Sequence, residues 1–512
     1  MMNKLRKLKV GFEKKWQENN FLVKPFLMLF LIYLVGISAI LLAGVHYADD
    51  VARTNYGYAG WNGFSRYTST LLAYGLHADG YLTNIAPLPQ ILAVAILALA
   101  SLVLTCLVVG KDKFKESPKK WWWYLIAVLP LGLSPYMLEC LSYQYDAPYM
   151  AISVLMAVVP FVFRGRKKWI YAVAILVGVL VICTTYQAAV GILPMVAIMI
   201  AIKEWNDGGR KTDKQVLKFL LFTAVMFILS LVIFQKILMK PRDAYASNSL
   251  PEIGSLFAVF FEHLKIYFEL IISDFKILWK VLLALVMLAF VGLYVLRSKR
   301  NKIVAALVAI IGVVLMAVMA FALYAVLEKP LYATRAMYPF GVFVAMLSIY
   351  VMYGRSKVAI VKIPVVVLVW CFLVFAFTYG NALREQDAYR NQVVNMVISD
   401  LNELPLMLED GDIIKNIQVS GNLGYSPVIL HMSSDYKILQ RLLAPSFSEY
   451  VPWMAYRIIQ ESGLPNLYYD ENDDLTTKKM PVLKDTVLYD ICGDKDGVLV
   501  KFKNSQRFDV LF

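Results

Sequence analysis

Runs of apolar residues, each about as long as a membrane-spanning helix, constrain the fold of this chain more than any other feature. A helix needs roughly 20 predominantly apolar residues to cross the hydrocarbon core of a membrane. Eleven such runs follow one another, at residues 26–45, 86–109, 121–138, 148–163, 169–184, 188–203, 216–236, 277–296, 303–327, 337–353 and 359–379. The sequence therefore predicts an α-helical polytopic membrane protein with about 11 transmembrane helices.

The fifth and sixth of these runs are nearly continuous. Only Thr184, Thr185, Tyr186 and Gln187 separate them, and the combined stretch is too long for a single span. We therefore expect a tight hairpin at these four residues.

The composition agrees with a membrane protein. Hydrophobic residues make up 59% of the 512 residues and charged residues only 17%, whereas soluble domains usually carry about 25% charged residues. The shortage of charge excludes an ordinary cytosolic enzyme, a disordered chain and a disulfide-stapled secreted domain. The five cysteines are scattered without the spacing of metal ligands.

The distribution of Lys and Arg orients the predicted helices. With a cytoplasmic N-terminus, the inner segments carry 28 of these residues, and the outer segments before residue 380 carry ten. Cytoplasmic loops of membrane proteins carry such an excess of positive charge. The net charge of +14 therefore reflects topology. No nucleic-acid partner is expected, because aromatic residues do not alternate with the basic ones.

Three regions follow from this topology: a basic cytoplasmic N-terminus at 1–25, a membrane domain at 26–379 and an extracytoplasmic domain at 380–512. The last region carries 13 basic and 19 acidic residues. The outer loops of the membrane domain are expected at 46–85, 134–148 and 237–276.

The C-terminal region has the pattern of a small α/β domain. Residues 413–419 alternate like a strand, and residues 493–497 form a hairpin turn between two more strands. Those strands are expected at 487–491 and 498–502, and helices at 381–404, 435–444 and 449–463. The region lacks the G-x-x-x-x-G-K-S/T phosphate loop, which argues against an ATPase or kinase.

Asp49 and Asp50, directly after the first apolar run, are the first candidates for catalysis. A carboxylate at the mouth of a helix bundle is able to act as a general base, tuned by burial and neighbouring charge. Adjacent side chains on a helix point about 100° apart, so only one of the two is expected to reach the reacting atom. The alternative is the solvated start of a loop.

The next outer segment, Glu139 to Asp146, carries two acids, an amide and two tyrosines but no basic residue. Such groups bind sugars, because polar groups contact hydroxyls and rings contact C–H faces. An aromatic belt at the membrane surface explains Tyr143 but neither of the acids. Tyr186 and Gln187 are expected at the same level.

Arg335 opens the tenth run on the outer side, where the positive-inside bias makes an arginine unexpected. Its planar guanidinium suits a phosphate oxyanion. The alternative is an anchor that extends to the membrane surface. Arg53 and Arg66, in the first outer loop, are candidates of the same kind.

Residues 255–276 have the pattern of an amphipathic helix. Their polar residues fall on one helical stripe, which consists of Glu262, Lys265, Glu269, Ser273 and Lys276. Such a helix lies in the plane of the membrane surface or packs against the bundle.

Several short motifs stand together in one half of the chain. They are Tyr47 to Arg53, Tyr56-Gly57-Tyr58, Gly60-Trp61, Ile85 to Gln90, Glu139 to Asp146 and Tyr186-Gln187-Ala188. In these motifs the chain resembles the bacterial serotype-converting glucosyltransferases of the type II class, membrane enzymes of the wider GT-C group. The likeness is most specific over roughly residues 45–190, and the C-terminal domain is similar only in its placement.

The resemblance implies glycosyl transfer on the outer side of the bacterial cytoplasmic membrane. The implied donor is a sugar, glucose, on polyprenyl phosphate, and the implied acceptor is a cell-envelope polysaccharide such as an O-antigen repeat. Asp49 or Asp50 would be the base of an inverting reaction, and Arg335 would stabilise the leaving phosphate.

Further implied substrate contacts are Arg53, Arg66, Glu139, Tyr143, Asp146, Tyr186 and Gln187. No cofactor is expected. Asp49, Asp50 and Asp146 are of the type that ligates a divalent cation, but we expect transfer without a metal.

Two other classes of function fit parts of the sequence. A transporter or flippase of a lipid-linked sugar would also have many spans, but its charged sites are expected near the membrane midplane. A sensory or assembly protein would carry cytoplasmic domains, whereas the inner loops are short and basic.

Overall fold

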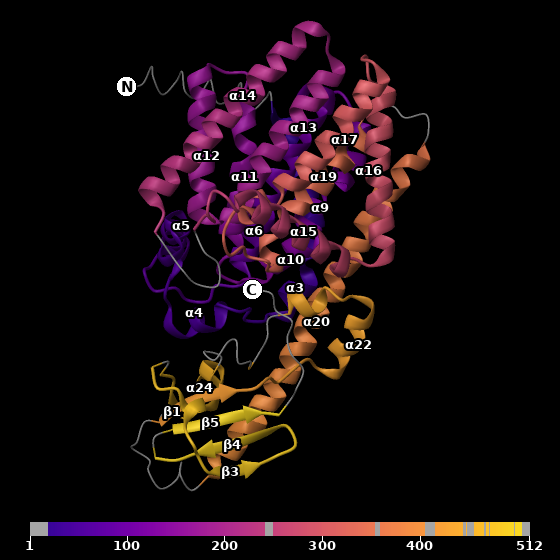
Figure 1. The fold of residues 1–512 in the computed structure, drawn as a ribbon. Helices are drawn as coiled ribbons and strands as arrows, with labels where there is room; N and C mark the ends of the chain where they lie inside the picture. Colours follow the sequence, from indigo (N-terminus) through magenta and orange to yellow (C-terminus); the bar gives the residue numbers. More distant parts are fainter. Residues whose placement is uncertain are drawn as a thin grey trace, which may run out of the picture.

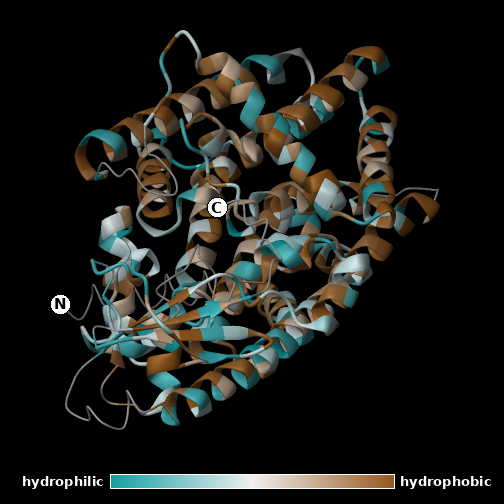
Figure 2. Ribbon diagram, turned by 60° about the horizontal axis from the view of Figure 1, so that its bottom comes forward, coloured by the Kyte–Doolittle hydropathy of each residue, from teal (hydrophilic) through white to brown (hydrophobic). Residues whose placement is uncertain are grey.

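The computed structural model describes residues 19–240, 249–353, 359–404, 415–443, 447, 455–464, 467–470, 472–495 and 497–503. Within these residues a large bundle of helices is followed by a small mixed sheet (Figure 1). The helices of the bundle are largely hydrophobic, whereas the sheet mixes hydrophilic and hydrophobic residues (Figure 2). The predicted class, apolar helices with a small C-terminal α/β part, is confirmed. Residues 1–18 of the predicted N-terminal segment lie outside the described residues, and so do residues 241–248 of the predicted loop at 237–276.

Seven helices of the described residues are long and apolar enough to cross a membrane, and a bent pair would make an eighth. Shorter apolar helices at Asn20–Gly36, Ala147–Phe163 and Pro339–Met352 coincide with three more of the predicted runs. The membrane character is thereby confirmed, while the number of eleven crossings stays a prediction. In chain order the bundle elements are η1 (Asn20–Leu22), α2 (Val23–Gly36), α3 (Ser38–Ala43), α6 (Leu88–Val109), α7 (Lys111–Lys115), η3 (Pro118–Lys120), α8 (Trp121–Val128), α9 (Pro130–Leu133), α10 (Pro135–Ser142), α11 (Ala147–Val158), η4 (Val159–Phe163), α12 (Lys168–Thr185), η5 (Gln187–Gly191), α13 (Ile192–Asp207), α14 (Arg210–Ile233), η6 (Phe234–Leu238), α16 (Ile277–Arg297), α17 (Lys302–Met319), α19 (Pro339–Met352), η8 (Ala359–Lys362) and α20 (Ile363–Asn402).

The predicted hairpin in the middle of the bundle is confirmed. Helix α12 ends at Thr185, and Tyr186 is extended, with φ −146° and ψ 104°. The chain then turns back through η5 into α13. The ninth run is shorter than predicted, because α17 ends at Met319 and a separate short helix follows.

The third apolar run contains a bend that the sequence analysis did not predict. Helix α10 is turned by 60° from the stretch Pro118–Leu133. Ser134 is extended, with ψ 146°, and Pro135 follows it. A residue before proline disfavours the helical conformation, and proline itself lacks an N–H donor. The bend carries α10, all of it buried, across the end of the bundle.

The segments between the apolar helices contain helices of their own. They are α4 (Asp50–Tyr56), η2 (Trp61–Phe64), α5 (Tyr67–His77), α15 (Leu256–Asp274), α18 (Ala322–Ala325) and η7 (Thr334–Ala336). The predicted amphipathic helix is confirmed as α15, with Phe257 and Phe261 exposed on it. Its position in the membrane surface stays a prediction.

The C-terminal sheet has the strand order β2-β1-β5-β4-β3. Its strands are β1 (Lys415–Ser420), β2 (Leu467–Tyr468), β3 (Val482–Asp485), β4 (Tyr489–Gly493) and β5 (Gly497–Phe502). The predicted hairpin of β4 and β5 is confirmed as antiparallel, with Ile491 opposite Val500. Strand β1 pairs in parallel with β2 and β5. Strand β3 was not predicted, because it is mostly exposed and shows no alternation.

The helices beside the sheet agree only in part with prediction. Those observed are α22 (Pro427–Asp435), α23 (Leu439–Leu442), α24 (Ala455–Ser462) and the short η10 (Leu475–Thr477). Residues 413–414, 444 and 449–454 of the predicted elements lie outside the described residues. The predicted helix at 381–404 is the second half of α20, which runs unbroken out of the bundle.

Two hydrophobic cores meet at one end of the bundle. The core of the sheet includes Val51 of α4 and Val393, Val394 and Val397 of α20. Helix α23 belongs instead to the core of the bundle. We call the end of the bundle that carries α4, α10 and η7 the sheet-proximal end (Figure 1).

Candidate active site

The two adjacent aspartates at the start of α4 have opposite surroundings. Asp50 is fully buried, and its Oδ2 accepts hydrogen bonds from the backbone N–H groups of Tyr47 (3.2 Å) and Gln144 (2.8 Å). Burial raises the pKa of the Asp50 carboxyl well above its ordinary value. The side chain of Asp49, in contrast, is 56% exposed. Asp50 therefore joins two loops, and Asp49 faces solvent.

A buried ion pair lies one helical turn after Asp49. Arg53 NH1 pairs with Asp146 Oδ2, and Trp61 Nε1 donates to Asp146 Oδ1 at 2.5 Å. The Arg53 guanidinium also lies 4.5 Å from the Trp61 ring and 3.8 Å from Asp49 Oδ2. Burial raises the pKa of Asp146, and Arg53 opposes that shift. The pair is thereby fixed in place, and Arg53 links the buried acid to the exposed one.

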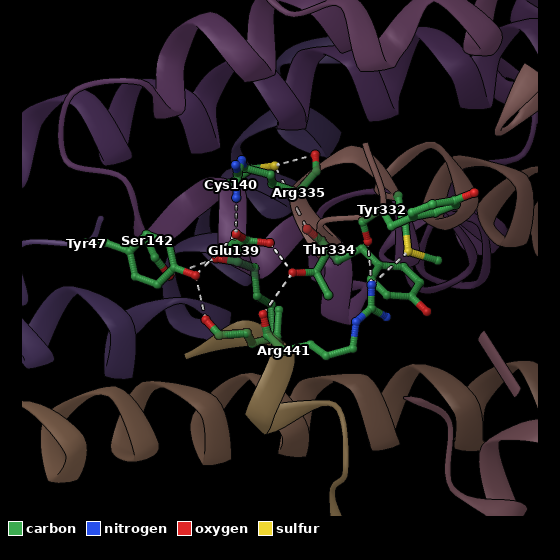
Figure 3. Close-up of polar contacts among 12 residues, drawn as sticks. Tyr47, Glu139, Cys140, Ser142, Tyr332, Thr334, Arg335 and Arg441 are labelled. Carbon is green, nitrogen blue, oxygen red and sulfur yellow. Dashed lines mark hydrogen bonds and ion pairs between the residues drawn. The ribbon is translucent and has the colours of Figure 1, made fainter. Parts of the chain in front are cut away.

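Glu139 of α10 is the centre of a second buried polar cluster (Figure 3). Its Oε2 accepts a hydrogen bond from Thr334 Oγ1, and its Oε1 lies 3.4 Å from Arg335 NH1 and 3.2 Å from the Tyr47 hydroxyl. The Arg335 side chain is 19% exposed. The structure therefore brings the predicted residues Glu139 and Arg335 together, from α10 and η7.

Arg66 and Gln187 form a third group. Arg66 Nε donates to Gln187 Oε1 at 3.2 Å, and Gln187 Nε2 donates to the Phe64 carbonyl at 3.0 Å. The Arg66 guanidinium lies 4.6 Å from the ring of Tyr186. The Tyr186 hydroxyl is buried without a hydrogen-bond partner among the described residues. This group fastens the first outer loop to the turn between α12 and α13.

Tyr143 packs beside Tyr47 of the Glu139 cluster. Its ring packs edge-on against Tyr47, with centroids 4.9 Å apart. Burial raises the pKa of the Tyr143 hydroxyl, Arg335 lowers it, and Glu139, Asp49 and Asp146 raise it. All ten candidate residues thus lie at the sheet-proximal end. Their assignment to catalysis and substrate binding stays a prediction.

Tyr47, Trp61 and Thr334 belong to these clusters but were not among the predicted site residues, and neither were Asp274 and Arg441 nearby. Tyr47 and Thr334 stand beside Asp49 and Arg335 in the chain, so the same motifs contained a signal for them. Asp274 and Arg441 are 167 residues apart, and nothing in the sequence links them. They form a buried ion pair, and Arg441 also donates to the Tyr332 carbonyl at 2.6 Å.

The described residues contain no group of three or more His, Cys, Asp or Glu side chains placed to hold a metal ion. Asp146 is engaged by Arg53 and Trp61, and Asp50 by two backbone N–H groups. Transfer without a metal stays a prediction.

Comparison with known proteins identifies the family. The model of the family Glucosyl transferase GtrII matches residues 38–352, which is more than half of the chain and contains all ten candidate residues. A relative from Salmonella phage P22, described as an uncharacterized 55.3 kDa protein in the gtrB 5' region, is 27% identical over 143 residues. That alignment covers 28% of this chain and spans only 28% of the relative. No solved structure matches the chain. The extent of the family match shows that the protein belongs to the GtrII glucosyl transferase family.

Proposed function

We propose that this protein transfers a glucosyl residue from a polyprenyl-phosphate-linked donor to a cell-envelope polysaccharide, such as an O-antigen repeat. The transfer takes place on the outer side of the bacterial cytoplasmic membrane and changes the serotype. Membership of the GtrII family supports the sugar and the reaction class. The observation that carries the proposal is an exposed carboxylate, Asp49, beside buried arginine–carboxylate pairs at the sheet-proximal end.

Asp49 is the better candidate for the base. A base must reach the proton of the acceptor hydroxyl, and the Asp49 side chain is open to solvent. Asp50 is fully buried, and its Oδ2 is occupied by two backbone N–H groups. Asp50 therefore serves to hold the loop that presents Asp49.

The proposed reaction is a single in-line displacement. Asp49 accepts the proton of the acceptor hydroxyl while the hydroxyl oxygen attacks the anomeric carbon and inverts it. The bond from that carbon to the phosphate oxygen breaks, and polyprenyl phosphate leaves with an additional negative charge. Arg335 stabilises this charge, because a fixed guanidinium acts most strongly where charge develops.

The basic groups around Tyr186 suit the phosphate of the donor. Arg66 stacks on the ring of Tyr186, and both Arg66 and Arg335 lower the pKa of its hydroxyl, which burial raises. The buried Tyr186 hydroxyl, which has no hydrogen-bond partner among the described residues and belongs to the ring beside Arg66, is a suitable donor to an anionic oxygen. We therefore assign the donor phosphate to this side and the acceptor to the side of Asp49.

The proposed sidedness is supported by the basic residues at the far end of the bundle. There Arg297 donates to the Tyr350 carbonyl, and Arg300 pairs with Asp213. These arginines belong to the segments predicted to face the cytoplasm, so the candidate site lies on the opposite, outer side.

The substitution Asp49→Asn tests the base. We expect the transfer rate to fall by about 10²–10⁴-fold, with folding retained because the side chain is exposed. The measurement is transfer of labelled glucose from polyprenyl-phosphate glucose to the envelope glycan, in membranes that contain the full-length protein.

Two further variants complete the experiment. Asp79→Asn changes an exposed acid of the same loop and should leave the rate unchanged. Asp50→Asn should lower thermal stability while the folded fraction keeps its activity. A full rate in Asp49→Asn would remove Asp49 from the mechanism.

A further inference from the structure

Helix α23 is the point where the C-terminal region enters the core of the bundle. Ile438, Leu439, Leu442 and Leu443 are all buried, and they pack into the same core as the apolar helices. The strands β1, β4 and β5 pack into a separate core. Helix α23 is therefore structurally a part of the membrane domain, although the sheet surrounds it in sequence.

The side chain of Arg441 fastens α23 to the bundle. Its guanidinium pairs with Asp274 at the end of α15, donates to the Tyr332 carbonyl at 2.6 Å and lies 3.6 Å from Met337 Sδ. Asp274 is buried, and it also accepts a hydrogen bond from the Tyr136 hydroxyl at 2.9 Å. A cation from the C-terminal region thus neutralises a carboxylate buried in the membrane domain.

The backbone carbonyls of α23 reach the partners of Glu139 (Figure 3). The Tyr47 hydroxyl lies 2.6 Å from the Leu442 carbonyl and 3.2 Å from Glu139 Oε1. A hydroxyl has one proton, so it donates to the nearer acceptor. With α23 in place, Tyr47 donates to Leu442, and Glu139 Oε1 faces Arg335.

The other hydroxyl beside the Glu139 carboxylate, that of Thr334, also lies against α23. Thr334 Oγ1 donates to Glu139 Oε2 and lies 3.4 Å from the Arg441 carbonyl. Thr334 directly precedes Arg335 in η7. Both hydroxyls that surround the Glu139 carboxylate therefore contact α23 as well.

We propose that Arg441 is a positioning residue for Arg335. Arg441 holds α23 on the bundle, so that the Tyr47 hydroxyl donates its proton to the Leu442 carbonyl. The Glu139 carboxylate then has no hydrogen bond from Tyr47 and orients the Arg335 guanidinium. If the Leu442 carbonyl is displaced, as expected without Arg441, Tyr47 donates to Glu139 instead, and the hold of Glu139 on Arg335 weakens. The role of Arg335 toward the donor phosphate rests on the proposed function.

The substitution Arg441→Gln tests the proposal in the full-length protein in native membranes. We expect the KM for polyprenyl-phosphate glucose to rise on the order of tenfold, because displacement of a positioned group is costly. Arg441→Lys, which keeps the charge, should restore part of the affinity. Tyr47→Phe removes the proton that would otherwise compete for Glu139, so adding it to Arg441→Gln should bring the donor KM back toward the wild-type value.

A matched control is available at the same interface. Lys276 Nζ lies 2.6 Å from Asp435 Oδ2, so this pair also joins the C-terminal region to the bundle, but Asp435 is largely exposed. The pair has no contact with the Glu139 cluster among the described residues. Asp435→Asn should therefore leave the donor KM unchanged.

A double-mutant cycle shows whether Arg441 acts through Arg335. In the Arg335→Gln background, Arg441→Gln should add no further change to the donor KM. Additive effects, or an unchanged KM in Arg441→Gln alone, would overturn the proposal.

Failure of the proposed function has a different signature, because the wild-type protein would then transfer no glucose at all. In that case a double-mutant cycle of Arg441→Gln and Tyr47→Phe, measured by thermal unfolding, tests the coupling between these two residues without an activity assay. Coupled losses of stability support it, and independent losses contradict it.

Discussion

Asp49 and Asp50 are neighbours in the chain, yet one carboxyl is open to solvent and the other is enclosed. The difference arises because the backbone N–H of Gln144, from a distant loop, binds Asp50 and turns it inward. A buried carboxylate with backbone partners stabilises a loop, whereas an exposed one remains available to a substrate. The sequence alone left this choice open, because it contains no information on which loop packs against α4.

The buried carboxyl of Asp274 leads to a prediction about the pH dependence of stability. Burial raises the pKa of its carboxyl to about 6, and the Arg441 charge opposes that shift. The folded state therefore binds a proton that the unfolded state releases, so the contribution of Asp274 to stability is lost as the pH rises through about 6. Without Arg441 the pKa of the Asp274 carboxyl is higher than in the wild-type protein. The free energy of unfolding of that variant therefore continues to fall as the pH rises above 6.

We therefore expect the difference in thermal stability between the wild-type protein and Arg441→Gln to grow between pH 6 and pH 8. The Tyr136 hydroxyl, which also contacts Asp274, stays protonated over this range. The measurement is unfolding of the purified protein in detergent at several pH values. A difference that does not change with pH would contradict this account of the pair.

At the scale of elements, the bend before α10 decides where Glu139 lies. The extended Ser134 is packed against α19 at Gly341, where a methyl group would lie 2.2 Å from Ser134 Oγ and 2.6 Å from the Pro130 carbonyl oxygen. Contacts this short force backbone to move. A glycine at this point of α19 is therefore needed for the bend.

The substitution Gly341→Ala should lower both stability and transfer, with a loss of about 1–3 kcal/mol from overpacking. Gly292→Ala in α16 is the matched control, because nothing lies within 4 Å of the added methyl group. There the change should be neutral or stabilising by up to about 1 kcal/mol. Thermal unfolding and the transfer assay measure both variants, and equal behaviour of the two would show that the contact at Gly341 is unimportant.

For the molecule as a whole, apolar length and charge were enough to predict the class of fold. The helical segments, the break at Tyr186 and the β4–β5 hairpin follow from local pattern. The bend at Ser134 was missed because the apolar run continues through it. The contact of Arg441 with Asp274 was missed because two distant polar residues, each ordinary in its own segment, leave no local signal.

The topology is a prediction for the whole chain. Reporter fusions at residues 165 and 400 should lie on opposite sides of the membrane, with residue 165 in the cytoplasm. Position 165 lies in a basic segment between two apolar helices, and position 400 lies near the end of α20. Activity of a cytoplasmic reporter at both positions would refute the orientation.

Helix α20 has a mechanical consequence. It is 40 residues long without a break, which corresponds to about 60 Å, roughly twice the thickness of the hydrocarbon core. In the proposed orientation, a rod of this length extends well beyond the lipid and carries the sheet with it. The clearance between the membrane surface and the sheet would then depend on the length of this helix together with the contact of the sheet with α4. Under the proposed function, that height would help to determine which part of the acceptor polysaccharide reaches Asp49.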